Sequence, residues 1–404
     1  MSFRAALLWV FVLVCGWMFV PWLVGSTGPF GKLTESKVSG SAPYPVLSPD
    51  GKTVAMVHDY SKMPGAYAQV VTTTVEVRES RSSRLLGTFS LPSTMTGTAT
   101  EEGWGNDFTA QYCDHGKYIV LSDTQNLIYV VDATTFRTHN TFDVRLMGDT
   151  AELAASHPRI SYVLGGCAAN GTVAVLHLFG GRFGEAGKIR LVDIETGETL
   201  KGIENLDTSD AESVVISPSG DMIAFLQHEN DVSHSGAGEL KVFRLRENAF
   251  DSQIAVGHLD LRPENGLAFA GDSSIVLNQR VINGDFKEHW AFRLVDLHTG
   301  NIAGPLGDEG TYKVAVSVDG KTVMAYRPRE SFSGSSRFTL SDRETGNRIV
   351  ESPALKSTYH GCFPNIGMGS CTPSYGIPTL QLSQDGRSVL AWWKDEPPRV
   401  FSLR

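Results

Sequence analysis

The chain has 404 residues, of which 41% are hydrophobic and 20% are charged. This balance is typical of a folded protein and excludes a disordered one. The formal net charge of -9 offers no basic surface for neutralising phosphates, so we expect no nucleic-acid partner.

The first element expected along the chain is a membrane segment. Arg4 precedes an uncharged and mostly apolar run from Ala5 to Val24. A spanning helix needs about 20 such residues, whereas the core of a signal peptide is about 7–15 residues long. The length therefore favours an uncleaved transmembrane helix, while Pro21 and the small residues after Val24 leave cleavage of a signal peptide open as the alternative.

This segment divides the chain into two domains: residues 1–28, the anchor or signal segment, and residues 29–404, the exported domain. The positive charge of Arg4 favours an N-terminus that stays inside, although Lys32 and Lys37 weaken that argument. We expect the exported domain to stay on the membrane through the helix, outside the cytoplasm. If the segment is cleaved, the domain is instead secreted and soluble in the periplasm or outside the cell.

A pattern of apolar strand, tight turn and apolar strand recurs from Pro45 to the end of the chain. VVISPSGDMIAFL, residues 214–226, is one of seven copies. The spacing of the turns, from 47 to 66 residues, is typical of a repeat array or propeller. The Asp-Gly and Ser-Gly steps predict two-residue hairpin turns, and the continuous apolar runs predict strands buried on both faces. The turns lie at Gly51, Gly116, Gly171, Gly220, Ser273, Gly320 and Gly386.

A second signature follows most copies: a strand, a turn of the type Asp-x-x-Thr-Gly, and another strand. IRLVDIETGETLKGI from Ile189 and FRLVDLHTGNIAGPL from Phe292 show it in full. Two strands from each signature give four strands per repeat. The sequence therefore predicts an all-β fold, a seven-bladed β-propeller of four-stranded antiparallel blades, preceded by the N-terminal hydrophobic helix.

With these turns in place, the chain resembles the WD40-like and YVTN-type propeller proteins of bacteria, including the family related to the amine dehydrogenase propeller. The resemblance covers roughly Phe30 to Arg404 and rests on the SPDG-like and VDxxTG turns. The Gly-His pair and the Trp-Asp dipeptide of true WD40 blades are absent, with Val131-Asp132 and Val192-Asp193 at equivalent places. The resemblance therefore implies the fold, and not the function of a eukaryotic WD40 protein.

Ring closure is predicted at the two ends of the exported domain. The final segment PRVFSLR supplies a third strand for the last repeat and leaves no residues for a fourth. The segment Gly31 to Gly40, ahead of the first repeat, is placed to supply that missing outer strand. Closure of this kind removes exposed sheet edges and holds the propeller close to the membrane segment.

The second strands of the repeats end in polar or aromatic side chains. In a propeller, the connections that leave these strands share a face with those that lead into the next blade. This arrangement has two interpretations: a ligand or partner site at the mouth of the channel, or strand ends that are polar because they meet water. Arginine and tryptophan dominate interaction hot spots, so Arg280, Arg327 and Trp393 are the strongest candidates. The candidates are His58, Asp59, His177, His228, Arg280, Arg327 and Trp393.

Four of the five cysteines lie in the exported domain, where disulfides form. Cys362 and Cys371 share one Gly- and Pro-rich loop and are the favoured pair, with two free thiols as the alternative. The pairing of Cys113 and Cys167 stays open. The aromatic loop between Glu351 and Pro378 is either a lid or partner surface, or a cap on the channel.

Motifs for chemistry are missing from the sequence: there is no GxSxG, HExxH or EF-hand loop, and no zinc-binding spacing of Cys and His. We therefore expect a membrane-anchored propeller that binds a protein or ligand without cofactor, metal or catalysis of its own. The rival hypothesis is a propeller enzyme, a lactonase-like hydrolase or an amine-dehydrogenase-like subunit, that uses histidine and acidic side chains at the channel mouth.

Overall fold

The computed structural model describes most of residues 31–404. The described residues are 31–39, 44–61, 69–91, 94–96, 109–122, 127–143, 160–179, 187–200, 211–228, 238–247, 249–257, 267–282, 288–307, 311–327, 336–355, 361–364, 371–374, 378–393 and 396–404. The predicted N-terminal helix lies outside these ranges. Within them, no helix has the length and apolar character needed to span a bilayer.

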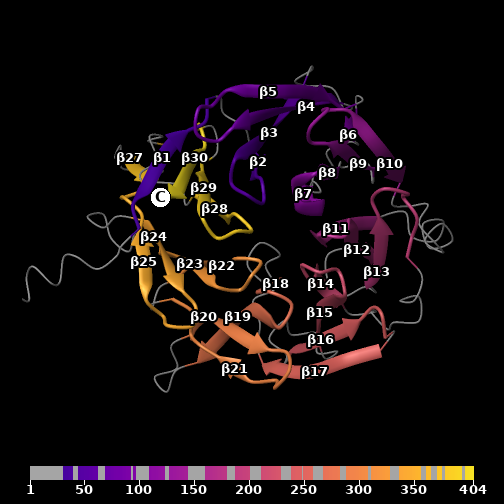
Figure 1. Ribbon diagram of the computed structural model, residues 1–404, viewed down its shortest axis with the longest axis vertical. Helices are drawn as coiled ribbons and strands as arrows, with labels where there is room; N and C mark the ends of the chain where they lie inside the picture. The colour runs from indigo at the N-terminus through magenta and orange to yellow at the C-terminus, as the bar shows by residue number, and fades with distance from the viewer. Residues whose placement is uncertain are drawn as a thin grey trace, which may run out of the picture.

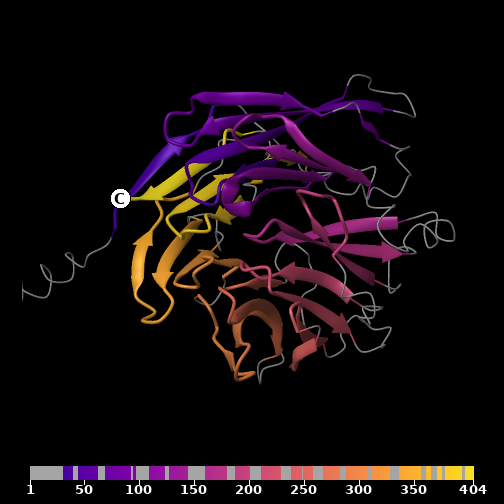
Figure 2. The ribbon, with the colours of Figure 1, turned by 45° about the vertical axis from the view of Figure 1, so that its right-hand side comes forward.

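The described strands form a ring of seven radiating antiparallel sheets around a central axis (Figure 1). The predicted seven-bladed propeller is thereby confirmed. Blade 3 has three strands in its described part, and the other blades have at least four. In Figure 2 the sheets are seen more nearly from the side. We number the blades by their order in the chain.

Each blade is a meander from an inner first strand to an outer last strand, and the bounds are as follows. Blade 1 contains β2 (Tyr44–Leu47), β3 (Thr53–Ser61), β4 (Gln69–Glu79) and β5 (Leu85–Ser90), with β6 (Thr94–Thr96) beside β4. Blade 2 contains β7 (Thr109–Cys113), the 3₁₀ turn η1 (Asp114–Gly116), β8 (Tyr118–Ser122), β9 (Leu127–Asp132) and β10 (Thr138–Asp143). Blade 3 contains β11 (Ile160–Cys167), β12 (Thr172–Phe179) and β13 (Gly187–Asp193).

The remaining blades follow the same plan. Blades 4 to 7 contain β14 (Ala211–Ile216), β15 (Met222–His228), β16 (Gly238–Arg244), β17 (Ala249–Gly257); β18 (Leu267–Phe269), β19 (Ser274–Ile282), β20 (Glu288–Asp296), β21 (Ile302–Ala303); β22 (Lys313–Val316), β23 (Thr322–Arg327), β24 (Arg337–Asp342), β25 (Arg348–Glu351); and β28 (Thr379–Leu382), β29 (Ser388–Trp392), β30 (Arg399–Leu403), β1 (Leu33–Lys37). A small separate hairpin, β26 (Gly361–Pro364) with β27 (Cys371–Ser374), precedes blade 7 in sequence.

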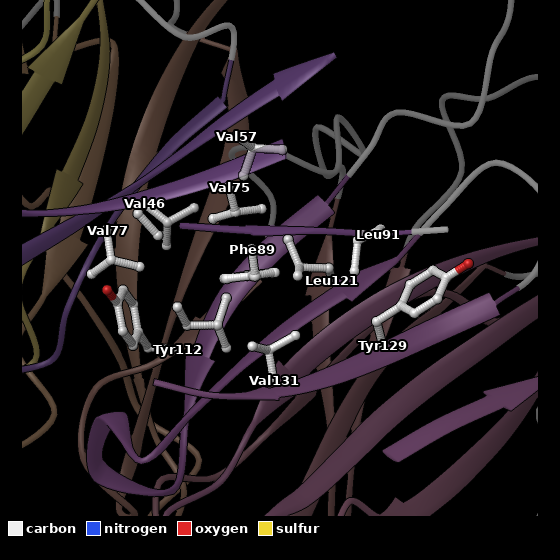
Figure 3. Packing of buried hydrophobic residues seen from close by; sticks show 12 residues of the cluster. Val46, Val57, Val75, Val77, Phe89, Leu91, Tyr112, Leu121, Tyr129 and Val131 are labelled. Atoms are coloured by element: carbon white, nitrogen blue, oxygen red, sulfur yellow. The ribbon is translucent and has the colours of Figure 1, made fainter. Parts of the chain in front are cut away.

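The hydrophobic core is divided among the junctions between neighbouring blades. At the junction of blades 1 and 2, Val57 and Val75 of blade 1 face Leu121 and Val131 of blade 2 (Figure 3). Side chains alternate between the two sides of a strand: Ile119 and Leu121 belong to this cluster, and Val120 packs toward blade 3. Both faces of the strand are therefore apolar, which explains the continuous hydrophobic runs in the sequence.

The turn between the first and second strands is stabilised by a recurring serine. In blade 1 the hydroxyl of Ser48 accepts a hydrogen bond from the Thr53 N–H (2.9 Å) and donates one to Asp50 (2.8 Å). Gly51 adopts the left-handed φ of 69° and donates its N–H to the Ser48 carbonyl. Buried Ser317 and Ser383 make the same pair of bonds in blades 6 and 7.

These turns confirm the predicted hairpins but correct their length. The Ser48 N–H donates to the Thr53 carbonyl, so four residues, and not two, lie between this hydrogen-bonded pair. A β-turn followed by a left-handed glycine fits a four-residue loop, whereas the predicted turn needs positive φ within two residues. In blade 5 the left-handed residue is Gly271, two positions before the predicted Ser273.

In blades 2, 3, 5 and 6 an aspartate stabilises the turn that follows the third strand. In blade 5, Asp296 accepts the N–H groups of His298 (3.0 Å) and Thr299 (2.8 Å) and the hydroxyl of Thr299 (2.9 Å). The hydrogen bonds from Thr299 are the main reason why the pKa of Asp296 lies below its usual value. Asp342 of blade 6 does the same through Thr345.

The two kinds of turn lie at one end of the ring, which we call the turn face. The connections from second to third strands and from each blade to the next lie at the other end, which we call the loop face. Backbone hydrogen bonds link the turn face from blade to blade, as from Ala169 N–H to Pro218 O (2.9 Å) and from Val318 N–H to Gln384 O (2.9 Å). The turn face is therefore a connected rim.

The two ends of the described chain close the ring in blade 7, as the sequence predicts. β1 pairs with β30 in antiparallel register, from Leu33 opposite Leu403 to Lys37 opposite Arg399 (Figure 1). Just beyond β1, the Val38 N–H donates to the Pro398 carbonyl, and the buried Val38 side chain joins the core between blades 7 and 1.

Candidate functional site

The structure places the predicted site residues at one end of the ring but in different blades. His58 and Asp59 lie in β3, His177 in β12 and Arg280 in β19. His228 ends β15, Arg327 ends β23, and Trp393 directly follows β29. The second strands all run from the turn face to the loop face. The candidates therefore lie toward the loop face, and their role in binding stays a prediction. The side chains of Asp59, His177, His228 and Arg280 lie outside the described part.

His58 is largely enclosed by its own blade. Its side chain is 14% exposed, and its Nε2 lies 4.0 Å from Glu76 Oε2 on the neighbouring strand β4. The same Glu76 oxygen binds Arg78 Nη2 at 2.7 Å. His58 thus forms part of a polar group within blade 1, beside the loop face.

Trp393 packs inside blade 7, in a position that sequence reasoning did not anticipate. The residue is 4% exposed and belongs to the core between blades 6 and 7. The guanidinium of Arg399 lies 4.7 Å from its ring centroid, and Arg399 pairs with the nearly buried Glu396 at 3.4 Å. In this conformation the ring stabilises blade 7, whereas Arg327 is exposed at the end of β23.

A cavity of about 310 Å³ lies on the central axis at the turn face. Its walls come from the first strands and the turns that follow them, because the first strand of each blade lies innermost (Figure 1). The side nearest blades 7, 1 and 2 contains Gln381, Gln384, Gln111, Asp114 and His115. The side nearest blades 3, 4 and 5 is glycine-rich and apolar, with Gly165, Gly166, Val215, Ile216 and Phe269.

The glutamines of this cavity were missed by the analysis of second-strand ends. Gln111 and Gln381 occupy the same position of the repeat, in β7 and β28, where most other copies have an apolar residue. Gln381 Oε1 accepts the Leu47 N–H of blade 1 at 2.9 Å. Such a polar residue in an otherwise apolar strand is the signal that could have revealed this site.

A disulfide joins Cys113, at the end of β7, to Cys167, at the end of β11. Their Cα atoms are 5.3 Å apart, and the bond links the innermost strands of blades 2 and 3 beside the cavity. This resolves the pairing that the sequence leaves open. Cys362 and Cys371 lie in the paired strands β26 and β27, but their side chains are outside the described part, so their disulfide stays a prediction.

No group of three or more His, Cys, Asp or Glu side chains able to hold a metal ion occurs among the described residues. The enzyme hypothesis depends on histidines at the loop face, and two of these, His177 and His228, have side chains outside that part. The rival hypothesis therefore stays untested.

Comparison with known proteins supports the fold. No family model matches the sequence, and no curated protein matches it. A chain from the crystal structure of a mitotic checkpoint complex superimposes with a TM-score of 0.50 at 12% identity, over 92% of this chain and 93% of that one. The structure of U3-55K gives a TM-score of 0.50 at 13% identity, over 91% and 98%. At this level of identity, the two structures share the fold with this chain.

Proposed function

We propose that this protein is an extracytoplasmic propeller scaffold that binds a protein partner at its loop face and is held at the membrane by its N-terminal segment. The observation that carries the proposal is the difference between the two faces. The turn face consists of short turns, linked by hydrogen bonds into a rim. The strands that border the loop face are separated by longer stretches of sequence, 12 residues between β6 and β7 and 16 residues between β10 and β11. Long connections on a rigid ring are favourable positions for recognition.

The disulfide supports an extracytoplasmic location. Disulfides persist in secreted and periplasmic proteins and are rare in the reducing cytoplasm. Cys113–Cys167 lies at a blade junction, where Cys113 is buried and Cys167 is partly buried. It agrees with the apolar N-terminal run, which favours a membrane helix or, in the alternative, a cleaved signal peptide.

The structural neighbours support a scaffold by analogy only. One of them was solved as part of a mitotic checkpoint complex, an assembly of proteins. A shared fold does not transfer a function, so the site must be tested directly. The bacterial WD40-like, YVTN-type subtype belongs to the same proposal and rests on the SPDG-like and DxxTG turns.

The test is a pull-down from detergent-solubilised membranes with the intact protein and with an Arg280→Ala, Arg327→Ala double variant. Trp393 is left intact because removal of a buried tryptophan costs about 3–5 kcal/mol and would confuse misfolding with lost binding. The matched control is Arg81→Ala with Arg387→Ala, two exposed arginines on turns of the other face.

We expect a partner to be captured by the intact protein and the control, and to be lost from the loop-face variant. Equal capture by all three proteins would remove the loop face from consideration. Capture lost equally from the control would indicate a turn-face partner instead. Recovery of the protein in the soluble fraction, at the mass expected after signal cleavage, would contradict the membrane anchor. It would not contradict the binding site at the loop face.

A further inference from the structure

The cavity at the turn face has two unlike walls, and the polar one is formed by side-chain amides. Gln111 and Gln384 have no hydrogen bond from their amide groups to any described residue, and the Nε2 of Gln111 is buried without a partner there. Gln381 uses its Oε1 for Leu47. A buried amide without a partner is costly, because its lost hydration is not replaced.

Among the described residues of the opposite wall, none of those from blades 4 and 5 offers these amides a polar side chain. Val215, Ile216 and Phe269 present apolar surface, and Ala268 is an exposed alanine on the innermost strand β18. Gly166, in the bulged end of β11, adds no side chain. A molecule that covers both walls therefore needs an aliphatic body and, on one side, a group that both donates and accepts hydrogen bonds.

The charges around the cavity disfavour an ionic ligand. Among the described residues that line it there is no lysine or arginine, and Asp114 is the one carboxylate. Asp114 already lies 3.6 Å from the ammonium of Lys117. An anion would find no lining Lys or Arg and would face Asp114, and a cation would have to compete with Lys117, so either would lose hydration without full compensation.

We propose that this cavity binds a small neutral molecule with an amide group on an aliphatic body. The amide pairs with Gln111 and Gln384, and the body packs against Val215, Ile216 and Phe269. The amide of Gln111 turns about its last side-chain torsion, which is broad, to present its N–H groups to the ligand. A volume of about 310 Å³ lies at the lower end of the range for ligand sites. The cavity lies at the turn face, so this proposal does not depend on partner binding at the loop face.

The test is a ligand-observed NMR titration of the full-length chain with three probes that share one ring: cyclohexanecarboxamide, cyclohexanecarboxylate and cyclohexylmethylammonium. We expect the carboxamide to bind at least about fivefold more tightly than either ion. Gln111→Leu should weaken carboxamide binding by about five- to tenfold, the value of one or two hydrogen bonds. Ala268→Phe should abolish it by filling the cavity.

Two matched controls separate the cavity from general damage. Gln227→Leu makes the same substitution at another glutamine with an unpartnered buried oxygen, near the loop-face end of β15. Ala303→Phe makes the same substitution at an exposed alanine on the outermost strand of blade 5. Both should bind like the wild type, and melting curves should show all four variants folded.

The proposal is overturned if none of the probes binds at millimolar concentration, or if the two ions bind as well as the carboxamide. Equal loss in Ala303→Phe and Ala268→Phe would overturn it as well, because the cavity would then not be the site. Failure of the loop-face pull-down has no bearing on these outcomes, since that variant leaves the cavity intact.

Discussion

The ring is held differently at two of its blade junctions. In blade 7 the two ends of the domain meet as paired strands, β1 and β30, and the closure consists of backbone hydrogen bonds and apolar packing. Between blades 2 and 3 a covalent bond, Cys113–Cys167, joins the inner strands. Blade 3 has three strands in its described part, and Val192 of β13 forms a single bridge with Thr199, which follows that strand. The covalent link therefore reinforces the ring at the innermost strands of blades 2 and 3, whereas the closure of blade 7 uses backbone pairing and apolar packing.

The strand closure should carry the largest share of stability. Removal of residues 1–39 deletes β1 and exposes the edge of β30, whereas removal of residues 1–30 leaves the pairing intact. We expect the longer deletion to cost more than about 5 kcal/mol and to give aggregated protein, because an opened ring exposes a sheet edge and part of its core. Size-exclusion chromatography and urea unfolding would show it. A monomeric longer deletion with an unchanged midpoint would contradict this closure.

The disulfide should rank next. The two cysteines are 54 residues apart, for which chain entropy gives a stabilisation of about 4 kcal/mol. We expect reductant, or Cys113→Ser with Cys167→Ser, to lower the urea midpoint accordingly. The same substitutions at Cys362 and Cys371 test the bridge predicted from sequence, whose shorter loop should contribute less. Peptide mapping under non-reducing conditions identifies both pairs, and a reductant-insensitive midpoint would contradict the first.

On its other side blade 3 packs against blade 4, and close packing there should contribute less to stability than the disulfide, though still measurably. A Cβ added to Gly165 would lie 2.4 Å from the Val214 carbonyl oxygen of blade 4, and backbone cannot move aside easily. We expect Gly165→Ala to cost about 1–3 kcal/mol by overpacking. Gly31→Ala, near the strand closure, is the control: its Cβ would meet the Leu403 side chain at 3.0 Å, which can shift. Equal unfolding midpoints for the two variants would show that blade 3 has room.

The sequence predicted the ring and its closure because both depend on local signals. Apolar runs and turn glycines recur once per blade, the Asp-x-x-Thr-Gly type of turn follows most copies, and the segment from Gly31 to Gly40 precedes the first repeat, where it is placed to supply an outer strand. The disulfide and the cavity are different. Cys113 and Cys167 meet only because neighbouring first strands converge on the axis, and Gln111 meets the apolar wall for the same reason. Trp393 was expected to bind because of its residue type, but tertiary packing buries its ring.

The smallest expected effect concerns an ion pair at the same junction as the disulfide. Glu195 of blade 3 accepts a hydrogen bond from Lys117 of blade 2 at 2.7 Å and one from Tyr118 at 3.1 Å. The Lys117 bond is the main reason why the pKa of Glu195 is lowered from its ordinary value.

A carboxyl group with a lowered pKa stabilises the fold above its unfolded pKa, which is near 4.5, and this stabilisation is lost as the pH falls through the folded pKa. In the Cys113→Ser, Cys167→Ser background, Glu195→Gln should therefore make the loss of stability between pH 6 and pH 3 shallower. Glu198→Gln, in the same turn, is the control and should leave the slope unchanged. Because the pair is exposed, the effect should shrink in high salt, and urea midpoints across pH at two salt concentrations measure it. Parallel slopes for the Glu195 variant and its parent would mean that the disulfide and the packed core hold this junction without the ion pair.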